Sequence, residues 1–116
     1  MHNFRGLSVW QRSMELAVMI YNATDHFPDK EKFGITNQLR RCSVSIPSNL
    51  AEGSGRDSEK EFKYFISISI GSIFELETQV ILSKKIKYLS NEKATMLIKE
   101  IREIQSMLIG LKKSLH

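Results

Sequence analysis

The sequence predicts an all-α protein, specifically an antiparallel up-down four-helix bundle with a proline-kinked second helix. Two observations lead to this fold class. Apolar residues recur every three or four positions along four stretches of the chain, and no stretch reads as a strand. Long linkers and internal repeats are absent from the sequence. We expect helices at 8–24, 35–53, 58–88 and 91–114, and we treat residues 1–116 as a single four-helix-bundle domain.

The first helix is predicted to begin at Ser8. Ser8 and Gln11 have the spacing of a capping box, in which each side chain reaches the backbone amide of the other residue. Pro28 restrains the residue before it toward extended geometry, so the helix should end near Thr24. Its apolar residues cover more than one narrow face; they are Val9, Trp10, Met14, Leu16, Ala17, Ile20 and Tyr21.

The second helix contains a proline within its apolar stripe. A proline inside a helix removes one backbone donor and costs roughly 3 kcal/mol. The stripe nevertheless keeps its phase across Pro47, so we expect one helix that bends between Ser43 and Pro47 and stops at Gly53 and Gly55. Hydroxyl groups are expected to bond the freed backbone groups; they belong to Ser43, Ser45 and Ser48. The stripe itself comprises Ile35, Leu39, Cys42, Ile46 and Leu50.

The third helix is unusually apolar. Ser58 and Glu61 form a second capping-box pattern at its start, and the single Gly71 costs only about 1 kcal/mol, so the helix should continue to about Tyr88. A helix in a monomeric bundle needs only one buried stripe. The surplus indicates a deeply central helix or contact with other subunits, and we expect a homo-oligomer. The apolar residues are Phe62, Phe65, Ile66, Ile68, Ile70, Ile73, Phe74, Leu76, Val80, Ile81 and Leu82.

The fourth helix carries a regular heptad seam. Ser90 or Asn91 should cap its start. Steps of four and three residues suit nearly antiparallel packing at about 20° in a left-handed bundle. The seam comprises Leu97, Ile101, Ile104, Leu108, Leu111 and Leu115.

A polar stripe runs beside the apolar stripe of the second helix. It consists of Gln38, Arg41, Ser45, Asn49, Glu52 and Arg56. One interpretation is a boundary stripe that hydrogen-bonds to neighbouring helices. The other is a ligand or nucleic-acid site.

Two segments carry a resemblance to a known family. Residues 38–53 read Gln-Leu-Arg-Arg-Cys-Ser-Val-Ser-Ile-Pro-Ser-Asn-Leu-Ala-Glu-Gly, and residues 71–79 read Gly-Ser-Ile-Phe-Glu-Leu-Glu-Thr-Gln. Together with Arg56, Phe62, Leu7–Trp10 and Phe27-Pro28, they resemble bacterial four-helix-bundle proteins encoded in intervening sequences of large-subunit ribosomal RNA genes. That family is sometimes labelled a ribosomal protein family. The accessory variability determinant of diversity-generating retroelements resembles the same family.

The resemblance implies a set of motif residues and an assembly. The motif residues are Gln38, Ser45, Pro47, Asn49, Glu52, Gly53 and Glu75. The related retroelement accessory proteins associate with nucleic acid and with a reverse transcriptase, so the resemblance implies RNA or DNA and a protein partner. It also implies a ring of five subunits. Cys42 stands where the family more often has alanine, which keeps a small apolar side chain at that position.

Composition and spacing argue against an enzyme. The three histidines, His2, His26 and His116, lie at the two ends and in one loop, so the sequence offers no metal-ligand cluster. The serines between Ser43 and Ser48 have no histidine or lysine near them in sequence to act as a base. We therefore expect no cofactor, and we interpret Cys42 as a small core residue. The first apolar run is too short for a signal or membrane segment, which predicts a cytoplasmic protein.

Two classes of function remain. A net charge of +4 and a pI near 9.3 permit binding to a polyanion. The first class is an oligomeric adaptor that binds RNA or DNA weakly through basic residues on both sides of the turn between helices two and three; they are Arg40, Arg41, Arg56, Lys60 and Lys63. The second is a protein-binding scaffold without nucleic-acid binding. An ion pair between Glu75 and a second-helix arginine would compete with the first, and Arg41 is equally consistent with either role.

Overall fold

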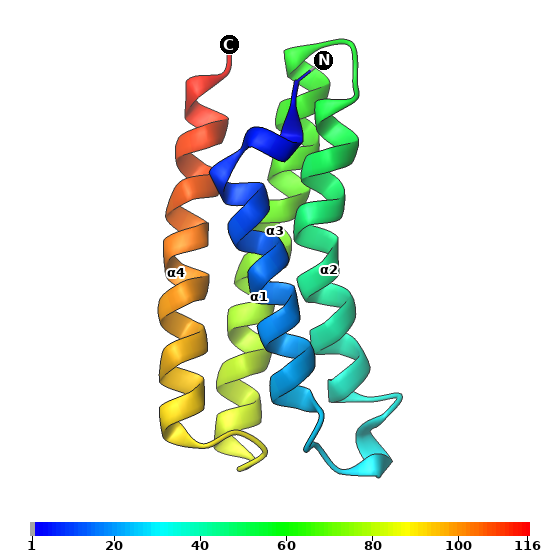
Figure 1. Cartoon of the computed structure of the whole chain (residues 1–116), viewed down its shortest axis with the longest axis vertical. Helices are drawn as coiled ribbons and strands as arrows, with labels where there is room; N and C mark the ends of the chain where they lie inside the picture. The colour runs from blue at the N-terminus through cyan, green and yellow to red at the C-terminus, as the bar shows by residue number, and fades with distance from the viewer. Residues whose placement is uncertain (1) are drawn as a thin grey trace.

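The computed structural model describes residues 2–116 as four long helices in up-down order (Figure 1). Two short 3-10 turns, η1 (Phe4–Gly6) and η2 (Asp29–Glu31), precede α1 and α2 respectively. The described residues contain no strand, so the predicted all-α bundle is confirmed. Every helix begins within one residue of its predicted start. The helices are α1 (Ser8–Thr24), α2 (Ile35–Ser54), α3 (Glu59–Lys85) and α4 (Asn91–Ser114).

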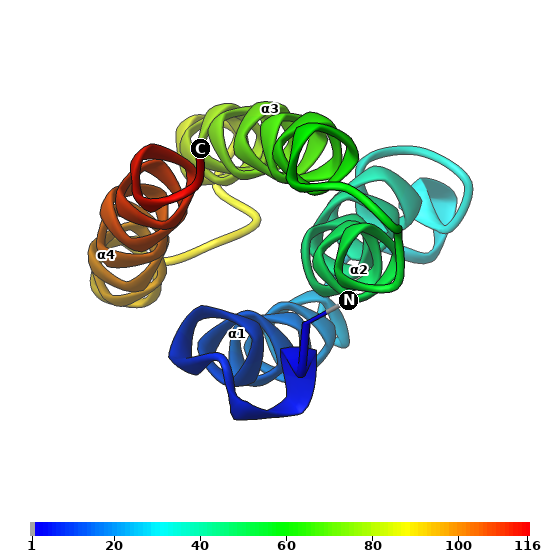
Figure 2. The same cartoon turned by 90° about the horizontal axis from the view of Figure 1, so that it is seen from above.

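The helices surround one apolar core. Seen from above, α1, α2, α3 and α4 follow one another around the bundle, and α1 lies beside α4 (Figure 2). Contact is most extensive between α2 and α3 and least extensive between α1 and α4. All four helices contribute fully buried side chains, among them Leu16, Ile20, Ile46, Leu50, Ile66, Ile73, Leu97 and Ile101.

The second helix passes through its proline without interruption. Pro47 is buried inside α2, and the helix continues to Ser54. The sequence-based choice of one helix over two is therefore right. Gly53, which we interpreted as part of the helix stop, is itself helical and buried. Its role concerns the distance to α3, described below.

The hydroxyl groups around the proline bond other carbonyls than expected. Ser43 donates from Oγ to the carbonyl of Arg40 at 2.8 Å, and the Oγ of Ser45 lies 2.7 Å from the carbonyl of Cys42. Ser48 is exposed. The carbonyl that the proline frees is that of Ser43 itself, and neither of these two hydroxyls bonds it. A serine in a helix reaches back to the carbonyl three or four residues before it. None of Ser43, Ser45 and Ser48 stands three or four residues after Ser43, so the prediction was wrong.

Two of the three predicted caps are present. Ser58 accepts a hydrogen bond from the backbone N–H of Glu61 at 3.1 Å, and Ser90 accepts one from Lys93 at 3.1 Å. The box at the start of α1 was wrong. Leu7 is the N-cap residue there, and Gln11 donates its side-chain N–H to the carbonyl of Arg5 at 2.9 Å.

The third helix ends three residues earlier than predicted. Lys87 adopts a left-handed conformation with φ of 68°, and the backbone N–H groups of Tyr88 and Leu89 both donate to the carbonyl of Ser83. Tyr88, just beyond the helix, donates its hydroxyl to Oε2 of Glu31 at 2.9 Å. No glycine marks this end of α3. The contact between Tyr88 and Glu31 joins residues far apart in the sequence, so the local sequence does not show where the helix ends.

The third helix is apolar but only partly covered by its own chain. An 18-residue window within α3 has a mean hydropathy of 1.4, and 33% of that window is buried. By length and composition α3 could cross a membrane, a property that apolar helices of soluble bundles share. Large apolar side chains on its outer surface face solvent, namely Tyr64, Phe74 and Leu82. The deeply central position that we considered for this helix is therefore not the one it occupies.

Candidate nucleic-acid interface

The five basic residues singled out from the sequence lie in two places rather than one. Arg40 and Arg41 are near the start of α2, whereas Arg56, Lys60 and Lys63 are at the turn into α3. Arg56 follows Arg40 by sixteen positions, nearly all of them along α2, which corresponds to about 24 Å at 1.5 Å per residue. The expected cluster on both sides of the turn is therefore wrong for the first pair.

Arg40 is committed to holding α1 against α2. Its Nε donates to Oγ1 of Thr24 at 2.9 Å, and its Nη2 donates to Oδ1 of Asp25 at 3.1 Å. The guanidinium also lies 4.7 Å from the centre of the Tyr21 ring. These contacts use the charge and several of the donors that a phosphate would need.

Arg41 does not form the ion pair with Glu75 that the sequence left open as one of its two roles. Within residues 2–116 the Oε1 atom of Glu75 accepts from Nε2 of Gln79 at 3.2 Å, and Arg41 is exposed without a salt bridge. Cys42 lies beside them, where burial raises the pKa of the thiol to about 12 and the nearby Glu75 carboxylate adds to the effect. Such a thiol stays protonated near neutral pH, which fits a core residue.

The polar stripe of α2 divides between contact with α3 and the surface. Oγ of Ser45 lies 2.7 Å from Oγ of Ser72, and Asn49 donates from Nδ2 to the carbonyl of Ser45 at 2.8 Å. Gln38 is exposed at the start of the same helix. Ser45 therefore matches the boundary interpretation, whereas Asn49 bonds within its own helix.

Gly53 lies where α2 packs closely against α3. A Cβ atom at this position would lie 2.6 Å from Cβ of Phe65 and 3.0 Å from Cδ1 of Phe62. Nearby, Ser69 donates its buried hydroxyl to the carbonyl of Ile46 at 2.9 Å. The absent side chain of Gly53 and the Ser69 hydroxyl thus allow the backbones of α2 and α3 to lie close together, which gives the motif residue Gly53 a packing role.

Arg56 lies in a hollow at the turn between α2 and α3. Its Nη2 donates to Oε1 of Glu52 at 2.9 Å, and its guanidinium lies 4.9 Å from the centre of the Phe65 ring. The hollow has a volume of about 490 Å³. It is lined by Arg56, Ser58, Lys60, Glu61, Tyr64 and Phe65.

Lys63 belongs to a different surface, which sequence reasoning missed. It lines a groove of about 440 Å³ between the first turns of α3 and the last turns of α4, together with Ile70, Ile109, Lys112 and Lys113. None of the three lysines takes part in a salt bridge within the described chain. Antiparallel order places the end of α4 beside the start of α3, so the pairing of Lys63 with Lys112 and Lys113 could have been inferred from the predicted bundle.

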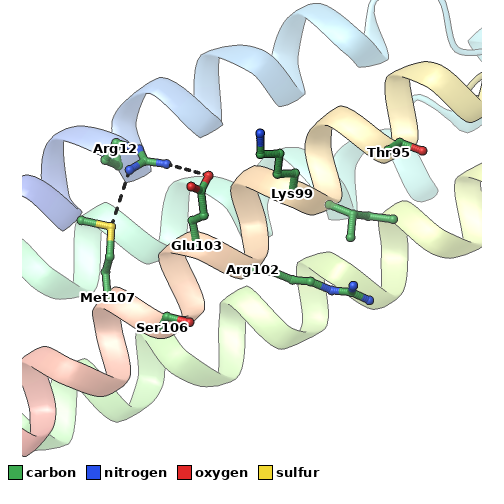
Figure 3. Close-up of a pocket in the computed structure, with 8 residues that line it drawn as sticks. Arg12, Thr95, Lys99, Arg102, Glu103, Ser106 and Met107 are labelled. Carbon is green, nitrogen blue, oxygen red and sulfur yellow. Dashed lines mark hydrogen bonds and ion pairs between the residues drawn. The ribbon is translucent and has the colours of Figure 1, made fainter.

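A larger groove, of about 840 Å³, lies along α4 where it faces α1 (Figure 3). Arg12 crosses from α1 and donates from Nε and Nη2 to the two carboxylate oxygens of Glu100, at 2.7 and 2.8 Å. A third contact joins Arg12 Nη2 to Glu103 at 3.2 Å. These hydrogen bonds hold the pKa of Glu100 below its usual range and raise the pKa of Arg12. Three cations line this groove, and two of them are paired with carboxylates: Arg12 with Glu100 and Glu103, and Arg102 with Glu77 at 3.2 Å. Only Lys99 has no salt bridge among the described residues, so the groove offers a polyanion fewer unpaired cations than the Lys63 groove.

A fourth hollow, of about 520 Å³, is almost entirely apolar. It lies between the outer faces of α1 and α2, and four of its side chains are exposed although apolar. They are Met14, Val18, Tyr21 and Val44.

Comparisons with known proteins identify a matching family and a similar solved structure. A family model described as 23S rRNA-intervening sequence protein matches residues 5–110. The fold is similar to the crystal structure of a protein of unknown function from the S23 ribosomal protein family of Bacteroides thetaiotaomicron, with 25% sequence identity and a TM-score of 0.83. That similarity covers 90% of this chain and 95% of the other. No curated protein matches the sequence.

Proposed function

The chain belongs to the 23S rRNA-intervening sequence protein family, and we propose that it is a non-enzymatic, oligomeric adaptor that binds RNA or DNA weakly through basic surface patches. The observation that carries this proposal is the groove lined by Lys63, Lys112 and Lys113. Phosphate contacts from lysines do not depend on base sequence, so the binding should show little sequence preference.

The lysine groove differs from the arginine sites in having cations to spare. Arg12, Arg40 and Arg56 each lie within 3.2 Å of a carboxylate oxygen. The three lysines have no such partner among the described residues. Unpaired cations near one another repel, and a phosphate chain would relieve that repulsion while releasing its own counterions. Phosphate contact is therefore favoured in the lysine groove over the paired arginines.

The surface also supports self-association. One apolar surface is the hollow between α1 and α2, and another is the outer face of α3 around Phe74 and Leu82. Two different apolar surfaces on one chain suit a head-to-tail contact, which closes into a ring when the rotation between subunits allows it. The resemblance to the retroelement accessory proteins makes a ring of five the most specific form of this proposal.

A ring would strengthen weak nucleic-acid binding. Each subunit would present the same lysine groove, and a strand held by one groove is at high effective concentration for the next. If the ring exists but binds no nucleic acid, the second candidate is a protein-binding scaffold, which the apolar hollow between α1 and α2 would suit.

Charge removal in the lysine groove, compared with equal charge removal at the far end of α3, tests the nucleic-acid proposal. We expect glutamine at positions 63, 112 and 113 to weaken binding strongly, because three phosphate contacts are lost. A matched control replaces Lys84, Lys85 and Lys87 at the other end of α3 with glutamine, which changes the net charge equally. Binding of a labelled oligonucleotide is measured by fluorescence anisotropy between about 50 and 200 mM salt, where affinity should fall by orders of magnitude when many phosphates are contacted.

The salt dependence separates local contacts from overall charge. Each lost contact should flatten the log-log slope by about 0.9 for duplex DNA, or about 0.7 for a single strand. An equal loss in the control would show that net charge, not the groove, governs binding. Absence of binding by the parent protein at low salt would favour the scaffold.

A substitution on the outer face of α3 tests the assembly. Phe74 is 48% exposed, so Phe74→Ser should leave the core intact yet reduce the molar mass measured by light scattering to that of one 13.4 kDa chain. Phe33→Ser is the matched control, because Phe33 is 86% exposed in the segment between α1 and α2. A parent protein that is already monomeric at micromolar concentration would refute the assembly.

A further inference from the structure

An exposed aromatic side chain stands beside two cations at the start of α3. Tyr64 is 63% exposed, and it lines the hollow of about 490 Å³ that also contains Arg56 and Lys60. Tyr64 and Lys60 are four residues apart on one helix and therefore share a face. An aromatic ring in such a position offers a flat apolar surface that water covers poorly.

The Tyr64 ring packs on Phe65, which lies at the close contact between α2 and α3. Tyr64 meets Phe65 edge-on, with ring centres 5.3 Å apart and planes at 83°. Phe65 in turn carries the guanidinium of Arg56 at 4.9 Å and packs against Gly53. Tyr64 is thus presented from a rigid helix rather than from a loop, and this lowers the entropy lost when a flat ligand stacks on it.

Resting on the nucleic-acid binding proposed above, we propose that Tyr64 is a stacking platform for an unpaired base of single-stranded nucleic acid. Arg56 and Lys60 contact the phosphates on either side of that base. Every base has a π face, so stacking on tyrosine tolerates any sequence, and it is unavailable to bases paired inside a duplex. The partner is therefore a single-stranded polynucleotide.

The charges around the hollow favour binding of a base over binding of several consecutive phosphates. Glu61 also lines the hollow, and Glu52 pairs with Arg56, so two carboxylates offset the two cations. A phosphate backbone alone would gain little there. The lysine groove, on the α4 side of the same end of α3, supplies unpaired cations for the strand as it continues.

Three oligonucleotides of equal length test the proposal by fluorescence anisotropy: a single-stranded oligouridine, a single-stranded oligothymidine and a mixed-sequence DNA duplex. Loss of one stacked base weakens single-strand binding by about tenfold. We expect Tyr64→Ala to show this loss with one or both single strands and to leave duplex binding within about twofold. Tyr64→Phe should retain the parent affinity, since phenylalanine keeps the ring.

A second exposed aromatic residue provides the matched control. Phe33 lies 5.6 Å below the amino group of Lys32, far along the chain from α3. Phe33→Ala should change neither single-strand nor duplex binding. Thermal unfolding and light scattering confirm that the Tyr64 variants keep their fold and assembly.

The outcomes distinguish this inference from the proposed function. Single-strand binding that depends on Lys63, Lys112 and Lys113 but not on Tyr64 overturns the stacking platform and leaves the adaptor function standing. An equal loss of single-strand and duplex binding in Tyr64→Ala also overturns it. No binding of any oligonucleotide by the parent protein overturns both. Loss with oligouridine alone, or with oligothymidine alone, supports the platform and identifies RNA or DNA as its partner.

Discussion

The contact between α2 and α3 and the contact between α1 and α4 are built in opposite ways. The first joins helices that are consecutive in the chain and make the most extensive contact in the bundle. The second joins the first and last helices of the chain and is the least extensive contact between neighbouring helices. At the first contact, small side chains allow the two helices to lie close together. At the second, oppositely charged side chains join the two helices.

Close approach at the α2–α3 contact depends on small side chains and hydroxyl groups. Gly53 lies against Phe62 and Phe65, and Ser69 donates to the carbonyl of Ile46. Gly53 has little room for a larger residue. Such a contact should be rigid, because a packed interior resists changes in volume.

The α1–α4 contact is open enough to leave a groove of about 840 Å³ along α4. Arg12 spans it with two hydrogen bonds to Glu100 and one to Glu103. The side chains of Arg12 and Glu100 remain 33% and 20% exposed. Ion pairs of this kind are screened by solvent and contribute little to stability, so this side of the bundle should open first.

The largest expected effect comes from adding a methyl group at the tight contact. Gly53→Ala should lower the free energy of unfolding by about 1 to 3 kcal/mol, because Cβ would lie 2.6 Å from Cβ of Phe65 and one helix must move. The obstructing atom is bound directly to the backbone, so no flexible side-chain tip can yield. Urea denaturation followed by circular dichroism measures the change.

Gly71→Ala is the matched control for that substitution. Gly71 is also within a helix, but a Cβ atom there meets nothing within 4 Å. Removing a glycine from a helix interior stabilises it by about 1 kcal/mol, so the two substitutions should change stability in opposite directions. A gain in stability from Gly53→Ala would contradict the close approach of α2 and α3.

Periodicity explains why the fold was predictable from the sequence. The apolar stripes of α2 and α4 recur at helical spacing over whole helices, and Pro47 does not disturb the phase. Ser58 and Ser90 are capping residues that act within their own turn. Signals of this kind lie in neighbouring residues, and their interpretation needs no knowledge of what packs against them.

The candidate site was less predictable because it depends on which helices meet. Gly53 was interpreted as a helix stop, although its neighbour across the contact is Phe65. Arg40 was assigned to a cation cluster, although it bonds Thr24 and Asp25 at the end of α1. Lys112 was overlooked, since it joins Lys63 only when α4 returns beside α3.

The smallest expected effect concerns the ion pair between α1 and α4. Hydrogen bonds donated by Arg12 hold the pKa of Glu100 below the ordinary glutamate value of about 4.3. A carboxylate with a depressed folded-state pKa stabilises the fold above the unfolded pKa, and that stability is lost as the pH falls through the folded pKa. Glu100→Gln should therefore cost about 1 kcal/mol or less at pH 7.

The difference between parent and variant should shrink in acid. Below the folded-state pKa both side chains are neutral, so the two urea denaturation curves should nearly coincide. Glu103→Gln is the matched control, because Glu103 makes only one contact with Arg12 and its side chain is 51% exposed. Its effect should be smaller at every pH. A Glu100→Gln difference that stays constant from pH 7 into acid would show that packing, not charge, holds α1 against α4, and the contrast with the α2–α3 contact would then be one of degree.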